Sequence, residues 1–244
     1  MNSVLLPGGS GGLGRVVTLR LIGEGYHCVV PYRNIEEAQQ LRAQLAPQQR
    51  DQLLLVEADV VDEAEVERVF GIATAQHRFH ALVHLLGGIR GWQEVADTGI
   101  EDWDALMGLN LRSLFLFARR AAAVFRQQGG GRIVTIGAMA SAKPSARQAA
   151  YGVSKAGVSA LTKILADEGR AYGMTANCIL PGIIDTEANR SWGAPEDVPR
   201  WTPPAHIAGL VAWLLGEDAA SVNGSDIQAF RSEERRVGKE CRSR

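Results

Sequence analysis

Seven short apolar runs alternate with longer segments of helical spacing along most of this chain. Most runs are continuously apolar rather than alternating, which is typical of strands that are buried on both faces. The runs are 3–7, 27–31, 53–58, 81–86, 132–137, 175–180 and a weaker one at 225–230. The helical segments are 12–24, 35–46, 62–77, 101–128, 148–172 and 203–216. Alternation of this kind predicts an α/β fold, a doubly wound, seven-stranded parallel sheet with helices on both faces.

Size and composition exclude several classes of protein. The chain has 244 residues, of which 46% are hydrophobic, and this suits one domain over residues 1–230. A net charge of −1 gives no reason to expect nucleic acid or a membrane surface as a partner. No apolar run is long enough to span a bilayer, and no signal peptide opens the chain. The three widely spaced cysteines predict neither a disulfide framework nor a metal site, so we expect a cytoplasmic protein.

The last fourteen residues, RSEERRVGKECRSR (231–244), differ abruptly in composition from the rest. The string resembles the in-frame translation of a sequencing-adapter oligonucleotide. The alternative is a natural basic tail that binds an acidic partner. We favour the artefact and leave this non-native segment out of the fold.

A glycine-rich stretch, PGGSGGLG (7–14), follows the first apolar run and opens the first helical segment. Glycine permits positive φ and lets backbone N–H groups approach a phosphate closely. The amino end of a helix adds a favourable dipole for an anion. Between a strand and a helix, such a loop predicts dinucleotide binding rather than a plain turn.

Tyr151 and Lys155 lie four residues apart in YGVSK, a spacing that places both on one face of a helix. A free phenol titrates near pH ~10, and a nearby ammonium lowers that pKa. The phenol can then give a proton to a carbonyl oxygen as hydride arrives. The alternative is an exposed polar pair on an amphipathic helix.

The order of these motifs resembles the short-chain dehydrogenase/reductase family from residue 3 to about 230. The resemblance implies a Rossmann-type NAD(P)-binding domain and hydride transfer. It implies that Tyr151, Lys155 and Asn110 are catalytic: Tyr151 as acid/base, Lys155 lowering its pKa and holding the nicotinamide ribose, and Asn110 supporting a water in a proton relay. Besides Tyr151 and Lys155, the implied cofactor contacts are Gly8, Ser10, Gly12, Leu13, Gly14, Asp59, Val60, Gly87, Pro181, Gly182, Ile184 and Thr186.

The end of the second apolar run decides which cofactor we expect. Tyr32 stands where NAD enzymes of the family usually carry an acid, and Arg33 follows it. A guanidinium can clamp a 2′-phosphate with paired hydrogen bonds. We therefore favour NADP(H), with NAD(H) as the alternative.

Three positions depart from the family pattern. Ala138 replaces the usual serine, whose hydroxyl would hydrogen-bond the substrate oxygen. Tyr151 alone can suffice, as in dihydropteridine reductases of this family; Ser141 can take over; or the protein binds cofactor without efficient turnover.

The sequence HLLG (84–87) replaces the family's NNAG, and His84 is interpreted as structural. Pro7 replaces a threonine and removes an N–H from the loop.

The substrate cannot be identified from the sequence. Trp92, Trp192 and Trp201 either line the substrate site or pack a lid onto the body. His77 and His80 have no acidic or thiol cluster nearby, so no metal site is expected.

Our first hypothesis is an NADP(H)-dependent oxidoreductase acting on a small carbonyl, quinonoid or alcohol substrate. The alternative is a cofactor-binding protein with little turnover, a redox sensor or partner subunit. By resemblance we expect a homodimer or homotetramer built through 101–128 and 148–172.

Overall fold

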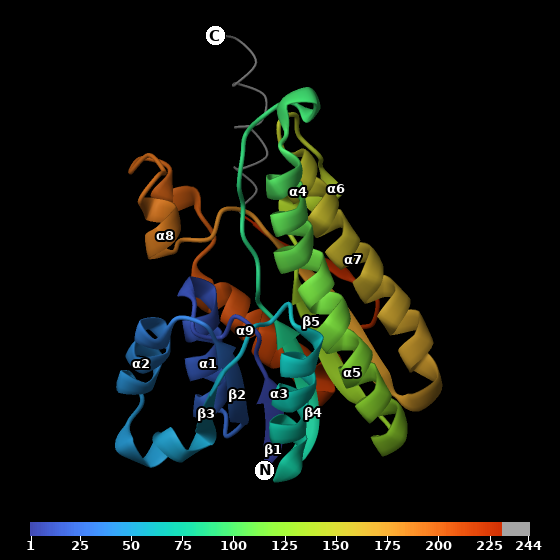
Figure 1. Ribbon diagram of the computed structural model, residues 1–244. Coiled ribbons are helices and arrows are strands. Elements are labelled where there is room, and N and C mark those ends of the chain that lie inside the picture. Colours follow the sequence, from blue (N-terminus) through green and yellow to red (C-terminus); the bar gives the residue numbers. More distant parts are fainter. Residues whose placement is uncertain (231–244) are drawn as a thin grey trace.

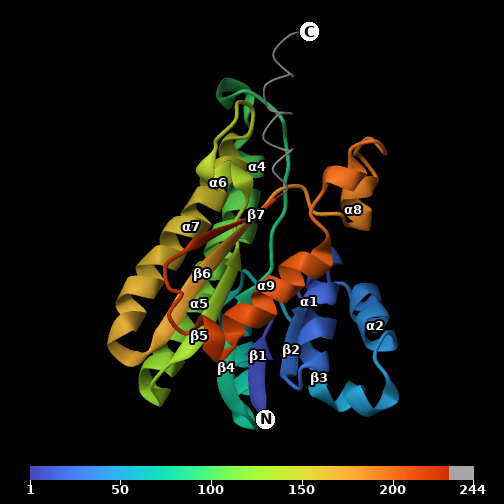
Figure 2. The same cartoon turned by 180° about the vertical axis from the view of Figure 1, so that it is seen from behind.

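The computed structural model describes residues 1–230, in which one seven-stranded sheet lies between two layers of helices (Figures 1 and 2). Every strand pairs parallel to its neighbours, in the order β3-β2-β1-β4-β5-β6-β7. The predicted fold class is therefore confirmed, whereas the predicted foreign tail lies outside the described residues. The strands are β1 Asn2–Leu5, β2 His27–Tyr32, β3 Leu53–Glu57, β4 Arg78–His84, β5 Gly131–Ile136, β6 Met174–Pro181 and β7 Asp226–Ala229.

The helices divide between the two faces of the sheet. One face carries α3 (Glu63–Ala75), α5 (Ser113–Gln128) and α7 (Ala149–Gly169), whereas α1 (Gly12–Gly23), α2 (Ile35–Ala43) and α9 (Pro204–Leu215) cover the other (Figure 2). Each layer buries its own apolar cluster against the strands. The first includes four phenylalanines, and each such ring contributes about 1.5–3 kcal/mol when removed from water. These rings are Phe70, Phe79, Phe117 and Phe125.

The predicted helix 101–128 is interrupted. It consists of α4 (Ile100–Leu106), a π-helical turn at Met107–Arg112, and α5. One wide turn leaves the helical spacing on either side almost intact, so hydrophobic periodicity does not detect it. Two further short helices were not predicted, α6 (Met139–Ala142) and α8 (Glu187–Arg190). Within residues 1–230 no helix has the length and apolar character that crossing a bilayer requires.

The chain reverses its direction of travel across the sheet between β1 and β4. From β1 it moves outward to β2 and β3, and then returns to β4 on the other side of β1. In open parallel sheets ligands bind beyond the carboxyl ends of the strands at such a reversal. The glycine loop follows β1, and HLLG spans the end of β4, so both lie at this point.

Candidate active site

The glycine loop is folded tightly on itself at the start of α1. Gly8 has φ +85°, and an ideal Cβ on Gly14 would lie 1.9 Å from the Gly8 carbonyl oxygen. Thr18, inside α1, donates its hydroxyl proton to the Gly9 carbonyl oxygen at 3.0 Å. A side chain at position 14 is thus excluded by backbone atoms, which cannot move aside as a flexible side chain can.

The HLLG segment packs directly against this loop. The Leu85 amide donates to the Pro7 carbonyl oxygen at 2.9 Å, and an ideal Cβ on Gly8 would lie 2.8 Å from the Leu86 amide nitrogen. Pro7 therefore lacks a donor but still contributes an acceptor that joins the ends of β1 and β4. The two segments that depart from the family pattern, Pro7 and HLLG, are therefore in direct contact.

The start of α1 fits a diphosphate. Gly11 precedes the helix, and no side chain among residues 1–230 caps its first turn. Free N–H groups at a helix amino end are suited to bind an anion. In the segment that follows β6, Thr186 packs against this turn, since an ideal Cβ on Gly12 would lie 3.2 Å from its Cβ. The Thr186 hydroxyl itself accepts a hydrogen bond from the Asn189 amide and so begins α8.

The remaining predicted cofactor residues are either buried or engaged in hydrogen bonds and strand pairing. Asp59 follows β3 and accepts a hydrogen bond from the Val61 amide, and Pro181 ends β6. Ser10, Leu13 and Val60 are buried. Ile184 pairs with Thr202 in an isolated bridge, and the Gly182 amide donates to the Ala229 carbonyl oxygen.

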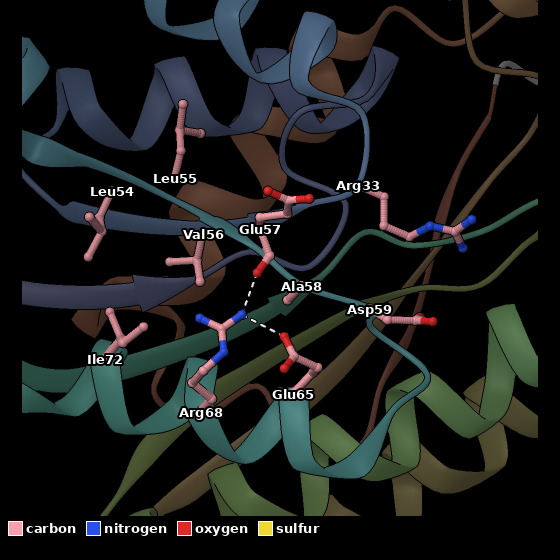
Figure 3. A pocket seen from close by; sticks show the side chains of 10 residues that line it. All are labelled: Arg33, Leu54, Leu55, Val56, Glu57, Ala58, Asp59, Glu65, Arg68 and Ile72. Atoms are coloured by element: carbon pink, nitrogen blue, oxygen red, sulfur yellow. Dashed lines mark hydrogen bonds and ion pairs between the residues drawn. The ribbon is translucent and has the colours of Figure 1, made fainter.

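Arg33 lies at one end of a groove of about 890 Å³ that follows the edge strand β3 (Figure 3). The Arg33 and Asp59 side chains point away from the other lining residues, whereas Arg68 donates to the Glu57 backbone carbonyl oxygen and to the Glu65 carboxylate. Arg33 is exposed and has no carboxylate partner among the described residues. Its guanidinium is thus available for an anion.

Lys155 is buried at the carboxyl end of β5. Only 4% of it is exposed, and its Nζ donates to the Ile136 carbonyl oxygen at 2.9 Å. An ideal Cβ on Gly87 would lie 2.7 Å from that Nζ, so a side chain at position 87 would displace the amine from this position. Burial disfavours the ammonium form and lowers the pKa of Lys155 to about 8.

Tyr151 is on the first turn of α7, four residues before Lys155. Burial raises the pKa of its phenol to about 12. The prediction that Lys155 lowers this pKa is wrong for the structure, because desolvation acts on the phenol and Lys155 contributes no opposing shift. The Lys155 amine is directed to Ile136 instead.

Asn110 lies in the π-helical turn and is fully buried. Its amide Oδ1 accepts from the Gly88 N–H at 2.8 Å, and Nδ2 donates to the Gly88 carbonyl oxygen and to Ser154 Oγ. Ser154 in turn donates to the Tyr151 carbonyl oxygen at 2.8 Å. Asn110 thus joins the β4 loop to α7.

Sequence reasoning missed Ser154 and Gly88 in this network. Ser154 is the fourth residue of YGVSK, where a serine is unremarkable in a helix, and Gly88 contributes through its backbone. Neither position carries a signal of its own in the sequence.

Ala138 is buried directly after β5, and its methyl group has no proton to donate. Ser141 is close by, in α6, and its Oγ accepts a hydrogen bond from the Ala138 N–H at 3.3 Å. Ser141 therefore supports the backbone at the position where the family places its serine.

His84 is a buried, hydrogen-bonded histidine, as the sequence favoured. Its Nε2 lies 3.0 Å from Ser113 Oγ, and burial, followed by the charge of Lys155, lowers its pKa to about 3. A neutral ring with a satisfied nitrogen is suited to a structural position rather than to acid–base work.

The segment between β6 and α9 is closed by aromatic packing. Trp201 is buried and contacts Trp192 with ring centroids 5.9 Å apart and ring planes tilted by 32°, so it packs this segment onto the body. Arg190 is held by a two-point ion pair with Asp185. Trp92 is exposed on the β4–α4 connection.

Comparisons with known proteins agree with this geometry. The family model for short chain dehydrogenases matches residues 2–197. The chain is 32% identical to the 3-oxoacyl-(acyl-carrier-protein) reductase MabA of Mycobacterium tuberculosis, over 92% of this chain and 90% of that protein. It is 29% identical to an NADPH-dependent aldehyde reductase-like, chloroplastic protein of Arabidopsis thaliana, over 91% and 90%. The solved structure of levodione reductase superposes with a TM-score of 0.86 at 28% identity, covering 96% and 97%.

Replacing Gly14 by alanine should lower the free energy of unfolding by about 3 kcal/mol, because the new Cβ overlaps the Gly8 carbonyl oxygen. Gly23→Ala is the matched control in the same helix, since nothing lies within 4 Å of its Cβ. That control should be neutral or stabilise by up to about 1 kcal/mol. Urea denaturation measures both, and equal effects would contradict the loop geometry.

Replacing Lys155 by methionine should stabilise the fold at pH 7. Burying the ammonium costs the wild type on the order of 3 kcal/mol. Methionine removes this cost but also removes the hydrogen bond to the Ile136 carbonyl oxygen, which destabilises the variant by about 1 kcal/mol. The folded pKa is about 8 and the ordinary value is 10.5. Between these values the unfolded chain binds more protons, so this burial cost is fully present below pH 8 and disappears as the pH rises toward 10.5.

The advantage of Lys155→Met should therefore be about 2 kcal/mol at pH 7 and shrink toward pH 10. Urea denaturation of wild type and variant at both pH values measures it. A variant less stable than wild type at pH 7 would show that the amine is not held at a cost.

Proposed function

The chain belongs to the short-chain dehydrogenase/reductase family, and from that premise we propose that it is an NADP(H)-dependent oxidoreductase. It passes hydride between nicotinamide and a small carbonyl, quinonoid or alcohol compound. The observation that carries the proposal is the buried Lys155 amine beside Gly87, one helical turn from Tyr151. Burying a cation without an acidic partner costs stability, which is a common mark of a functional site.

Cofactor binding divides between two places at the carboxyl edge of the sheet, the end of β1 and the ends of β4 and β5. The free amides at the start of α1 hold the diphosphate, with Gly8, Gly12 and Gly14 allowing its approach. Lys155 binds the nicotinamide ribose at the carboxyl ends of β4 and β5. The bound nicotinamide supplies or accepts the hydride.

Tyr151 moves the proton. In the reduction direction its phenol donates to the substrate oxygen, and a raised pKa keeps that phenol protonated and ready to donate at neutral pH. In the reverse direction the phenol must lose its proton, which a pKa of about 12 opposes.

NADP(H) is favoured over NAD(H) on two grounds. Arg33 is an exposed cation without a carboxylate partner in residues 1–230, at the end of β2 where a 2′-phosphate would lie. The Arabidopsis relative is named for its dependence on NADPH. The three relatives named above all carry reductase names, which supports a carbonyl compound as substrate.

The second candidate function is cofactor binding with little turnover. It is favoured by Ala138, because a methyl group cannot hydrogen-bond the substrate oxygen and removal of such a donor can cost about 3–4 kcal/mol of transition-state stabilisation. Ser141 has a hydroxyl nearby, whose oxygen accepts a hydrogen bond from the Ala138 amide. A substrate that is easily reduced can turn over without a serine donor, and in that case the first function holds despite Ala138.

For assembly we propose a homodimer or homotetramer formed through α5 and α7. Large apolar side chains on these helices face solvent in the single chain, with Phe115 48%, Val153 48% and Ile164 54% exposed. Exposed apolar groups that gather on neighbouring helices are typical of an interface.

NADPH should bind, and its absorbance should fall when a suitable carbonyl compound is added. Tyr151→Phe should retain cofactor affinity within about twofold and lose at least about 100-fold in turnover, because the proton donor is gone. Fluorescence titration and a panel of aldehydes, ketones and quinones measure both. Tight binding without oxidation across the panel would replace the first function by the second.

Arg33→Asp should shift preference from NADPH toward NADH by at least about tenfold in kcat/KM, because a carboxylate repels the 2′-phosphate and accepts from ribose hydroxyls. Arg50→Asp is the matched control, since it makes the same change of charge on an exposed arginine before β3. Unchanged ratios for Arg33→Asp, or equal shifts in both variants, would refute the assignment.

A further inference from the structure

A chain of buried hydrogen bonds joins β4 to the π-helical turn that carries Asn110. His84 is the last residue of β4, is 1% exposed, and has its Nε2 3.0 Å from Ser113 Oγ. Ser113 is fully buried at the start of α5 and donates its hydroxyl proton to the Leu109 carbonyl oxygen at 2.5 Å. The chain therefore runs from the strand to the residue just before Asn110.

The direction of the Ser113 hydrogen bond to Leu109 favours one tautomer of His84. A serine hydroxyl has one proton, and Ser113 uses it on Leu109. Its oxygen then presents lone pairs to the ring, an arrangement that suits a proton on the Nε2 of His84 and donation from that nitrogen. The low pKa of about 3 keeps the ring neutral throughout the neutral pH range.

The anchored turn determines where the Asn110 amide lies. Leu109 packs on the β4 loop, since an ideal Cβ on Gly88 would lie 3.0 Å from Leu109 Cδ2. Asn110 then holds both the N–H and the C=O of Gly88. Gly87, which precedes Gly88, lies directly against the Lys155 amine. A shift of the π-helical turn would therefore move the backbone that confines Lys155.

We propose that His84 and Ser113 are positioning residues: their hydrogen bond holds the π-helical turn so that Asn110 clamps the Gly87–Gly88 backbone beside Lys155. The histidine replaces the first asparagine of the family's usual NNAG, so this arrangement is a feature of this chain's own sequence. The kinetic part of the inference rests on the proposed function, whereas the structural part does not.

The test compares two replacements of His84 with a matched control. His84→Phe keeps a ring of similar size without a donor, and His84→Gln places an amide donor near the position of Nε2. The control is Thr162→Val, which removes a buried hydroxyl contact between β5 and α7, Thr135 to Thr162, away from the π-helical turn. NADPH affinity, kcat for a carbonyl found in the panel, and amide hydrogen exchange of 107–113 are measured for each.

His84→Phe should lower kcat by about tenfold with NADPH affinity within about twofold, because a lost buried donor loosens the turn. Exchange at 107–113 should rise by at least about fivefold. His84→Gln should restore both to within about threefold of wild type. Thr162→Val should leave both unchanged even where it lowers thermal stability.

The inference is overturned if His84→Phe leaves exchange at 107–113 unchanged, or if His84→Gln is as impaired as His84→Phe, since the loss would then come from packing. It is also overturned if Thr162→Val raises exchange at 107–113 equally. Absence of NADPH oxidation by the wild type would refute the proposed function instead, and the exchange measurement would still decide the role of His84.

Discussion

Burial of the Lys155 amine between the ends of β4 and β5 is the constraint on which the rest of the site depends. An ammonium without an acidic partner is costly in a protein interior. One carbonyl, from Ile136, offsets part of that cost, and Gly87 leaves the amine room that a side chain would take. Asn110 then holds the adjoining Gly88 by both backbone groups, and Ser154 connects the same amide to the helix that carries Tyr151. The fold thus holds a destabilising buried amine one helical turn from Tyr151.

The parts of this arrangement that follow from short-range pattern could be predicted from the sequence. Continuous apolar runs between helical segments determine a parallel sheet, because only strands covered on both faces can be apolar throughout. The position of PGGSGGLG after the first run places it at the amino end of α1, and the four-residue spacing of Tyr151 and Lys155 places both on one side of α7. The close approach of Gly14 to the Gly8 carbonyl oxygen explains in atomic terms why the loop is glycine-rich.

What could not be predicted depends on contacts between distant segments. The π-helical turn at Met107–Arg112 leaves no trace in hydrophobic periodicity, because the spacing on each side continues. Ser113 acquires its role only because β4 brings His84 beside it, 29 residues earlier in the chain. The pKa of Tyr151 was predicted in the wrong direction for the same reason. Spacing placed an ammonium near the phenol, but burial of the phenol and the turn of Lys155 toward Ile136 decide the shift.

The measurement that tests the central claim most directly is isotope transfer. The protein is incubated with NADPH carrying deuterium at C4 of the nicotinamide, in separate samples labelled on each face, together with a carbonyl compound from the panel. The account predicts that wild type moves one deuterium to the carbonyl carbon from one face only, seen as a mass increase of the alcohol, and that Tyr151→Phe does so at least about 100-fold more slowly. Alcohol formed without deuterium from either sample, or formed equally fast by Tyr151→Phe, would contradict it.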